Sequence, residues 1–231
     1  PTTTEYKNNR PATKEKFDEN TYYFLYYVGD YDSSAWLKRW VGQYWERDKM
    51  RGEIPLMWCF NPNLSNRVPM IFDYVYENKT ANDYITAGDS GAGYVMPAAL
   101  FKEGSNHRTM PDGARNWAAY CSKFYQKFDM DITGFIINGN YPMDERVMNL
   151  FNNISARGSF HNDPRHRLTI YKGTPYVYLH NGVDARPAYV EESVKSMYSY
   201  MNDMLDYGNF GAYRNVCHSP TELYNLQARF I

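Results

Sequence analysis

The sequence predicts an α/β protein with one barrel-like domain, either an irregular (β/α) barrel or a seven-stranded one. Short apolar runs with strand character alternate with segments whose apolar residues recur at helical spacing, which is typical of a parallel sheet. About seven such units fit into 231 residues, whereas eight full units take about 250. A flat, doubly wound sheet is the alternative. We expect residues 1–20 to be a linker or lead-in and residues 21–231 to form the domain.

The first four predicted strands are the apolar runs at residues 21–28, 54–60, 84–87 and 132–137. The first of these runs has no polar alternation, which indicates a strand buried on both faces. Apolar residues at helical spacing follow each run, so we expect helices around residues 36–44, 68–75, 117–128 and 147–154.

The second half of the chain continues this alternation and adds a hairpin. A short strand at residues 159–160 precedes a polar loop, and residues 168–179 are expected to form a hairpin that turns at Lys172-Gly173. A helix around residues 190–201 leads to the last strand at residues 210–216. Ser219-Pro220-Thr221-Glu222 matches a capping box with proline at the first helical position, so a final helix is expected to start there.

Composition narrows the functional classes. The net charge is −1 and no basic stripe is visible, so we expect no nucleic-acid partner. No run of about eighteen apolar residues exists, so we expect no membrane span. The three cysteines form no CxxC motif and are expected to be buried free thiols. The 23 Tyr, 12 Phe and 5 Trp side chains either fill a core or offer rings on which sugars can stack.

The most informative segment is the glycine-rich turn at residues 88–97, Gly-Asp-Ser-Gly-Ala-Gly-Tyr-Val-Met-Pro, which follows a predicted strand. Its glycines allow a sharp turn and let a ligand approach the backbone closely. A dinucleotide fingerprint would need glycine where Met96 stands, and Pro97 removes a backbone donor. We therefore expect no nucleotide cofactor, and a purely structural turn is the alternative to a ligand site.

Three segments resemble the GxGYxYP putative glycoside hydrolases. Residues 91–97 resemble the family signature, with Met96 in place of its second tyrosine. Residues 27–32 resemble the family's SDGDN strand end, except that Tyr31 and Ser33 replace its glycine and asparagine, and residues 54–62 resemble its second strand. The resemblance covers roughly residues 20–231 and implies a C-terminal catalytic-type domain with a carbohydrate partner. It also implies a preceding N-terminal domain and secretion to an extracellular or periplasmic location, although the chain begins at Pro1 without a signal peptide.

In a parallel barrel or sheet, the active site lies at the carboxyl ends of the strands. Asp30 and Asp32 follow the first predicted strand and Asp89 follows the third, so we predict these three as catalytic. Glycoside hydrolysis needs one carboxylic acid and one carboxylate on either side of the scissile bond. The alternative is that these residues cap the helices that follow, and no Glu stands at a clear strand end.

The predicted substrate-binding residues come from the same strand ends and from the glycine-rich turn: Trp58, Asn61, Gly91, Gly93, Tyr94, Asn138, His161, Asp163, His166 and His218. Trp58 and Tyr94 are expected to form a sugar platform. A metal-dependent polysaccharide deacetylase is a further alternative, in which His161 and His166 would join Asp30 or Asp32. Because Pro164 breaks any helix between the two histidines, we expect no metal ion.

The sequence thus predicts a glycoside hydrolase without cofactor that uses a carboxylate pair. The alternative is a non-catalytic domain that binds glycans, which the departures at Tyr31 and Ser33 support. No GxSxG motif is present, so nucleophilic serine chemistry is not expected.

Overall fold

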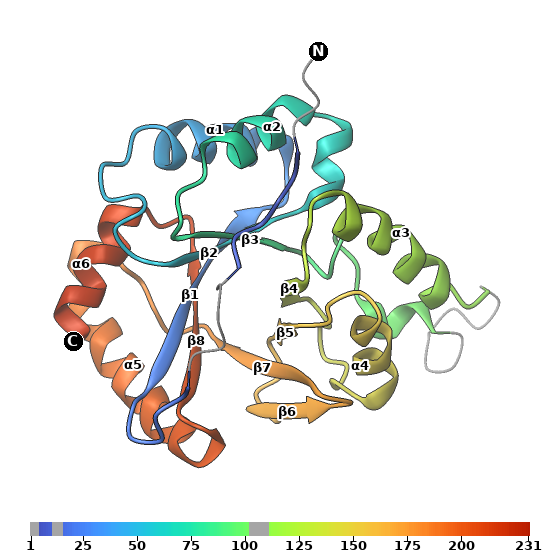
Figure 1. The fold of residues 1–231 in the computed structure, drawn as a ribbon. Helices are drawn as coiled ribbons and strands as arrows, with labels where there is room; N and C mark the ends of the chain where they lie inside the picture. The colour runs from blue at the N-terminus through green and yellow to red at the C-terminus, as the bar shows by residue number, and fades with distance from the viewer. Residues whose placement is uncertain (1–4, 11–15, 102–110) are drawn as a thin grey trace.

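The computed structural model describes residues 5–10, 16–101 and 111–231, without the side chain of Asp30. In these residues, seven parallel strands form a closed barrel (Figure 1). The strand order is β5-β4-β3-β2-β1-β8-β7, and pairing between β5 and β7 closes the ring. This confirms the predicted seven-stranded barrel over the flat sheet. The strands are β1 (Tyr23–Tyr31), β2 (Leu56–Phe60), β3 (Asp83–Ala87), β4 (Ile132–Ile136), β5 (Gly158–His161), β7 (Thr174–His180) and β8 (Phe210–Val216).

The helices surround the barrel (Figure 1). Within the described residues they are α1 (Ser34–Trp40), α2 (Pro69–Asn78), α3 (Ala114–Lys127), α4 (Glu145–Asn152), α5 (Val190–Met204) and α6 (Pro220–Phe230). Short turns of other helix types join them: η1 (Val41–Trp45), η2 (Pro62–Asn66), η3 (Pro97–Leu100), η4 (Pro187–Tyr189) and η5 (Leu205–Tyr207). None of the described helices is long and apolar enough to cross a membrane.

Alternate residues of each barrel strand face two different cores. In β2, Met57 and Cys59 belong to the cluster that fills the barrel interior, together with Phe135 and Leu179. The other residues of β2, among them Trp58, belong to the larger cluster between barrel and helices. Successive side chains of a strand point to opposite faces, so a strand buried on both faces is apolar throughout.

Two local predictions are confirmed in the second half of the chain. Strand β6 (Leu168–Tyr171) pairs antiparallel with β7 through a turn at Lys172-Gly173. Both turn residues have positive φ, 49° and 82°, as a two-residue hairpin turn of type I′ requires. Ser219 caps α6 in a complete capping box with Glu222.

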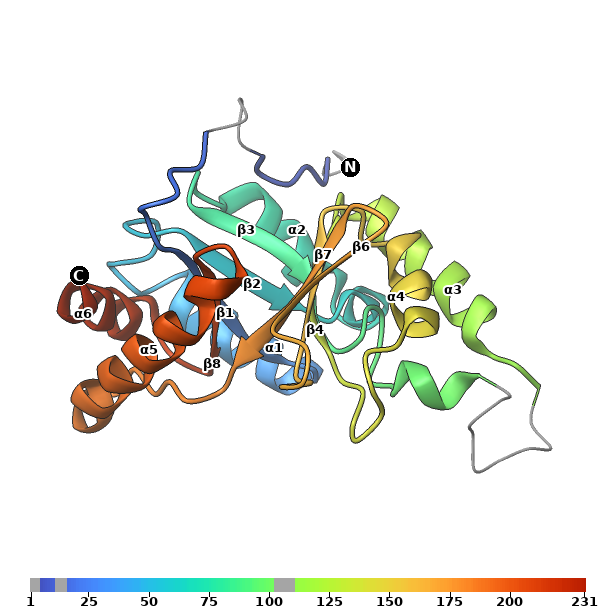
Figure 2. The same cartoon turned by 90° about the horizontal axis from the view of Figure 1, so that it is seen from below.

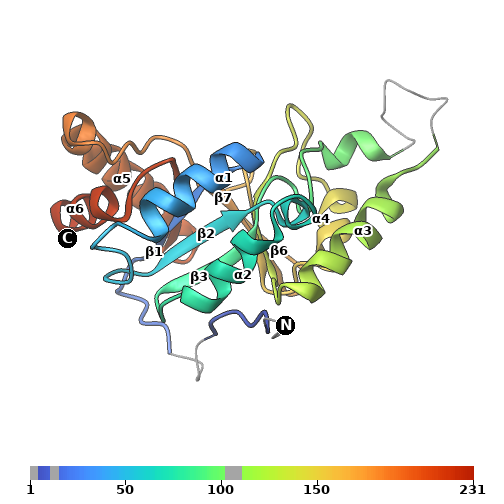
Figure 3. The same ribbon diagram turned by 90° about the horizontal axis from the view of Figure 1, so that it is seen from above.

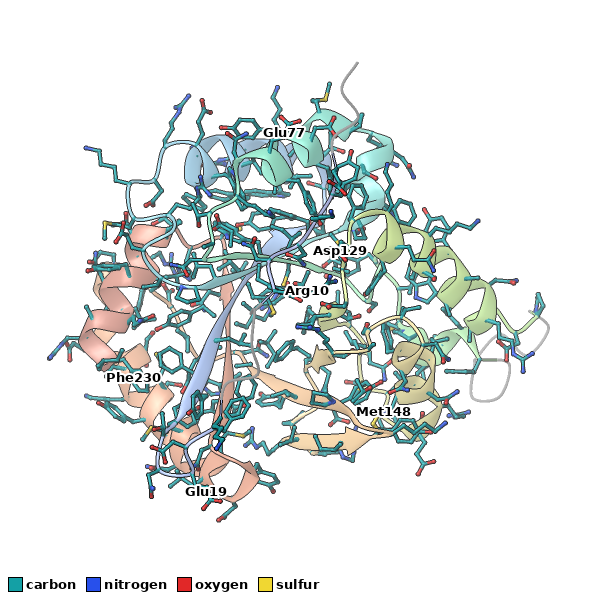
Figure 4. The ribbon with its side chains drawn as sticks, viewed as in Figure 1. Arg10, Glu19, Glu77, Asp129, Met148 and Phe230 are labelled. Carbon is teal, nitrogen blue, oxygen red and sulfur yellow. The ribbon has the colours of Figure 1, made fainter. Side chains whose placement is uncertain are left out.

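Residues 5–10 lie across the amino-terminal end of the barrel, where Arg10 reaches Asp129 (Figures 1 and 4). Within the described residues, strand β3 pairs with β2 along its whole length but with β4 only at Ala87, so the edge of its middle that faces β4 has no strand partner. The Asn8 side chain fills this place: its Nδ2 donates to the Ile85 carbonyl (2.6 Å) and its Oδ1 accepts from the Ile85 N–H (3.0 Å). This part of the lead-in is therefore docked on the barrel.

Candidate functional site

A pocket of about 680 Å³ lies at the carboxyl ends of β7 and β8. Its walls are the loop after β7, the first turns of α5 and the end of β8, and they include Asp184, Arg186, Glu192, Arg214 and His218. Residues 5–10 lie at the opposite end of the barrel (Figures 2 and 3). The pocket is therefore at the end where parallel barrels hold their active sites.

His218 stands in this pocket between two carboxylates. It is 6% exposed; its Nε2 lies 3.7 Å from Asp184 Oδ1, and its Nδ1 lies 3.7 Å from Glu222 Oε2. Burial lowers the pKa of His218, although both carboxylates act to raise it. Among the described residues its Nδ1 has no hydrogen-bond partner. His218 is thus a buried histidine of the pocket wall between two carboxylates, and its role in substrate binding stays a prediction.

Asp184 is held rigidly in the pocket wall. The Arg186 guanidinium binds its carboxylate through both Nε and Nη2, and these hydrogen bonds lower the pKa of Asp184. The Ser193 hydroxyl lies 2.8 Å from both the N–H and the carbonyl of Asp184. Asp184 and Arg214 are not among the substrate residues predicted from the sequence. The only sequence signal for Arg214 is a lone charge inside an apolar strand.

Arg214 joins the pocket to the barrel interior. It lines the pocket, and its guanidinium carbon lies 5.0 Å from the ring centre of Phe135, an interior residue. Its Nε is buried and has no hydrogen-bond partner among the described residues. Burial raises the pKa of the Cys59 thiol, a hydrogen bond with Thr86 lowers it, and the charges of Asp89 and Arg214 act on it in opposite directions. Asp89 follows the carboxyl end of β3 and Arg214 stands near the carboxyl end of β8, so both belong to this end of the barrel.

Asp89 is fixed by an unusual turn at the end of β3. Asp89 and Ser90 have left-handed φ values of 54° and 61°, a conformation that costs about 1–3 kcal/mol per non-glycine residue. Ser90 holds the turn on β4: its N–H donates to the Phe135 carbonyl (2.8 Å), and its Oγ accepts from the Ile137 N–H (2.8 Å). Asp89 is 5% exposed. Backbone strain that is held in this way often marks a functional site.

The two glycines that follow serve packing. Gly91 and Gly93 have φ values of 111° and 141°, which disfavour other residues. A Cβ on Gly91 would lie 2.9 Å from Cys121 Sγ, and a Cβ on Gly93 would lie 3.0 Å from Asn63 Nδ2 and 3.3 Å from the Trp117 ring. The space beside each glycine is filled by the protein and not by a ligand. We therefore assign both glycines to the packing of the turn against α3 and η2.

The other predicted residues near this turn differ in role. Tyr94 is 63% exposed and can reach a ligand. Asn138 is 1% exposed, and its amide is occupied by the backbone: it accepts from the Ala98 N–H and donates to the carbonyls of Tyr141 and Pro142. Asn61 caps η2 by accepting from the Asn63 N–H. The two asparagines thus shape the loops.

His161 and Asp163 likewise organise a loop. The Asp163 N–H donates to His161 Nδ1 (3.1 Å), and burial lowers the pKa of His161 to about 4. Burial alone would raise the pKa of Asp163, but hydrogen bonds from the Arg165 guanidinium and the Met143 N–H lower it to about 2. His161 is fully buried, whereas His166 is exposed. Among the described side chains, no three of His, Cys, Asp and Glu come together as metal ligands.

Trp58 corrects the prediction of a sugar platform. It is 1% exposed, packs against Trp45 with ring centres 5.1 Å apart, and donates its indole N–H to Asp83 Oδ1 (2.8 Å). Its position on β2 turns the ring outward, into the core between barrel and helices. Trp58 is therefore a core residue.

Asp30 and Asp32 belong to the carboxyl end of β1. The pairing of β1 with β2 shifts between Val28 and Tyr31, where β1 holds one residue more, so Asp30 lies in a bulge. Asp32 is half-buried directly after the strand. Ser33, not Asp32, is the N-cap of α1. Since β2 alone separates β1 from β3, Asp30, Asp32 and Asp89 come to the same end of the barrel.

Comparison with known proteins gives the family. The model of the GxGYxYP putative glycoside hydrolase C-terminal domain matches residues 20–199. The chain belongs to this family. No functionally curated protein matches it.

Two solved structures share the fold. A putative hydrolase from Bacteroides thetaiotaomicron superposes with a TM-score of 0.71 at 21% identity, over 98% of this chain and 45% of that one. The chain thus spans less than half the length of that protein. A putative polysaccharide deacetylase from Mycobacterium smegmatis gives a TM-score of 0.53 at 11% identity, over 96% of this chain and 88% of that one.

Proposed function

We propose that this GxGYxYP domain hydrolyses glycosidic bonds at the carboxyl end of its barrel. The observation that carries the proposal is Asp89, a carboxylate that is 5% exposed and held by a strained turn at the barrel mouth, at the end where β1 also brings Asp30 and Asp32. Membership of the glycoside hydrolase family supports a carbohydrate substrate.

The chemistry needs two carboxyl groups with different tasks. One protonates the leaving oxygen, and the other attacks the anomeric carbon or activates water. We assign one task to Asp89 on β3 and the other to Asp30 or Asp32 on β1. His218 and Arg214 both line the neighbouring pocket, and imidazole and guanidinium groups are of the kinds that hydrogen-bond sugar hydroxyls.

The test is hydrolysis of a panel of hexasaccharides from cellulose, xylan, mannan, laminarin, starch and polygalacturonan, followed by chromatography of the products. Asp30→Asn, Asp32→Asn and Asp89→Asn keep the side-chain shape but cannot transfer a proton. We expect a fall in kcat of about 10²-fold or more for the two residues that form the pair. Asp206→Asn is the matched control, because Asp206 is exposed and precedes β8 at the opposite end of the barrel. Wild-type rates in all three site variants would contradict the assignment.

A glycan-binding domain without catalysis is the second candidate. It is favoured by the two departures from the family strand end, because Tyr31 is 1% exposed in the core and Ser33 caps α1. Binding of a hexasaccharide without cleavage would support this candidate. Release of acetate from acetylated xylan would instead support the deacetylase alternative.

The full-length protein and its location follow from the same proposal. The family model describes a C-terminal domain, which supports the prediction of a preceding N-terminal domain. Secretion to an extracellular or periplasmic location stays a prediction of the family relationship.

A further inference from the structure

Three aromatic rings form a stack along α1 and η1. The ring centres of Trp36 and Trp40 are 5.7 Å apart with an angle of 10° between the planes, and those of Trp40 and Tyr44 are 4.7 Å apart at 20°. Trp36 is 41% exposed, whereas Trp40 and Tyr44 are half-buried. The stack therefore presents one indole ring to solvent and supports it from below.

The stack is fixed by a hydrogen bond at each end. At its outer end, the Ser33 hydroxyl accepts from the Trp36 N–H, so Trp36 stands in the first turn after β1. At its inner end, the Tyr44 hydroxyl donates to the carbonyl of Cys217 (2.9 Å), and Cys217 lines the pocket. The stack thus follows β1, whose carboxyl end carries Asp30 and Asp32, and its inner end is bonded to the segment after β8 that lines the pocket.

We propose that Trp36 is a binding platform for a sugar ring of a glycan chain whose neighbouring part occupies the pocket. This inference rests on the proposed carbohydrate substrate and deepens it: the substrate is a chain longer than the pocket itself holds. The flat C–H face of a pyranose matches an apolar ring face, and the ordered stack lowers the entropy lost on binding.

A polar group stands beside this platform. The guanidinium carbon of Arg39 lies 5.7 Å from the Trp36 ring centre and 4.9 Å from that of Trp40. Its N–H groups can donate to the hydroxyls at the rim of a bound sugar. Trp36 and Arg39 together provide the apolar face and the polar edge that a sugar ring needs, a role that the buried Trp58 cannot fill.

The test compares chain lengths. Affinities for the six hexasaccharides named above and for the matching disaccharides are measured by calorimetry with the Asp89→Asn protein, which limits cleavage during titration. Trp36→Ala should weaken hexasaccharide binding about tenfold or more and leave disaccharide binding unchanged, and Trp36→Phe should restore most of the loss.

The control is Tyr198→Ala. Tyr198 is 44% exposed and packs on Phe230 with ring centres 4.8 Å apart, but its hydroxyl bonds the last turn of α6, away from the pocket. Equal hexasaccharide affinity in Trp36→Ala and in the parent would overturn the platform even if the enzyme cleaves the glycan. Failure of the parent and the wild type to bind any panel member would overturn both the platform and the proposed function.

Discussion

Trp58→Phe is expected to reduce stability without reducing glycan affinity. Phenylalanine keeps an aromatic ring in the core but removes the N–H that donates to Asp83 Oδ1 at 2.8 Å. Loss of a hydrogen bond to a charged group costs about 1.5–3 kcal/mol, and the smaller ring adds a partial cavity, so we expect a total of about 2–4 kcal/mol. With a urea m-value of about 2–3 kcal/mol/M, the unfolding midpoint should fall by about 0.7–2 M.

Circular dichroism in urea measures this midpoint, and hexasaccharide calorimetry measures the affinity. Trp45→Phe is the matched control, because Trp45 is 2% exposed and packs on Trp58, but its indole N–H has no partner among the described residues. The difference between the two variants then isolates the hydrogen bond to Asp83. An unchanged midpoint for Trp58→Phe together with lost glycan binding would show that Trp58 contacts the substrate and that its placement in the core is wrong.

Two further predictions concern stability alone. Asn8→Ala should lower the free energy of unfolding by about 1–3 kcal/mol, because it removes both hydrogen bonds to Ile85. The control is Arg10→Ala, which breaks exposed ion pairs and should cost less than about 1 kcal/mol. Equal urea midpoints for Asn8→Ala and wild type would refute the docking of residues 5–10. Burial lowers the pKa of His161 to about 4 in the folded protein, whereas the imidazole has its ordinary pKa of about 6.5 in the unfolded chain. As the pH falls, the unfolded chain therefore protonates His161 first. The free energy of unfolding should then fall between about pH 6.5 and pH 4, by up to about 3 kcal/mol. His161→Gln, which keeps an acceptor for the Asp163 N–H, should flatten this part of the pH profile, and an unchanged profile would assign the loss to other groups.

The sequence predicts which segments form strands, but it does not predict on which face of a strand a given side chain lies. The run at residues 54–60 predicts β2 because it is apolar throughout. The same property hides its register, since a strand buried on both faces has no polar residue to mark one side. Met57 lies on the face of β2 that points into the barrel, and Trp58 lies on the face that points toward the helices. This assignment depends on the register of β2, which only the closed barrel shows.

The end of the barrel at which the proposed site lies is also predictable, because parallel strands bring their carboxyl ends together. What the sequence does not show is how much of each polar side chain is used by the loops themselves. The Asn138 amide forms hydrogen bonds with three backbone groups, and His161 Nδ1 accepts from the Asp163 N–H. Both side chains therefore shape the rim of the barrel. His218 and Arg214, in contrast, line the pocket at the carboxyl ends of β7 and β8, which neither Asn138 nor His161 does. Contact with the pocket, and not merely a place after a strand, is therefore the reason for including these two residues in the proposed site.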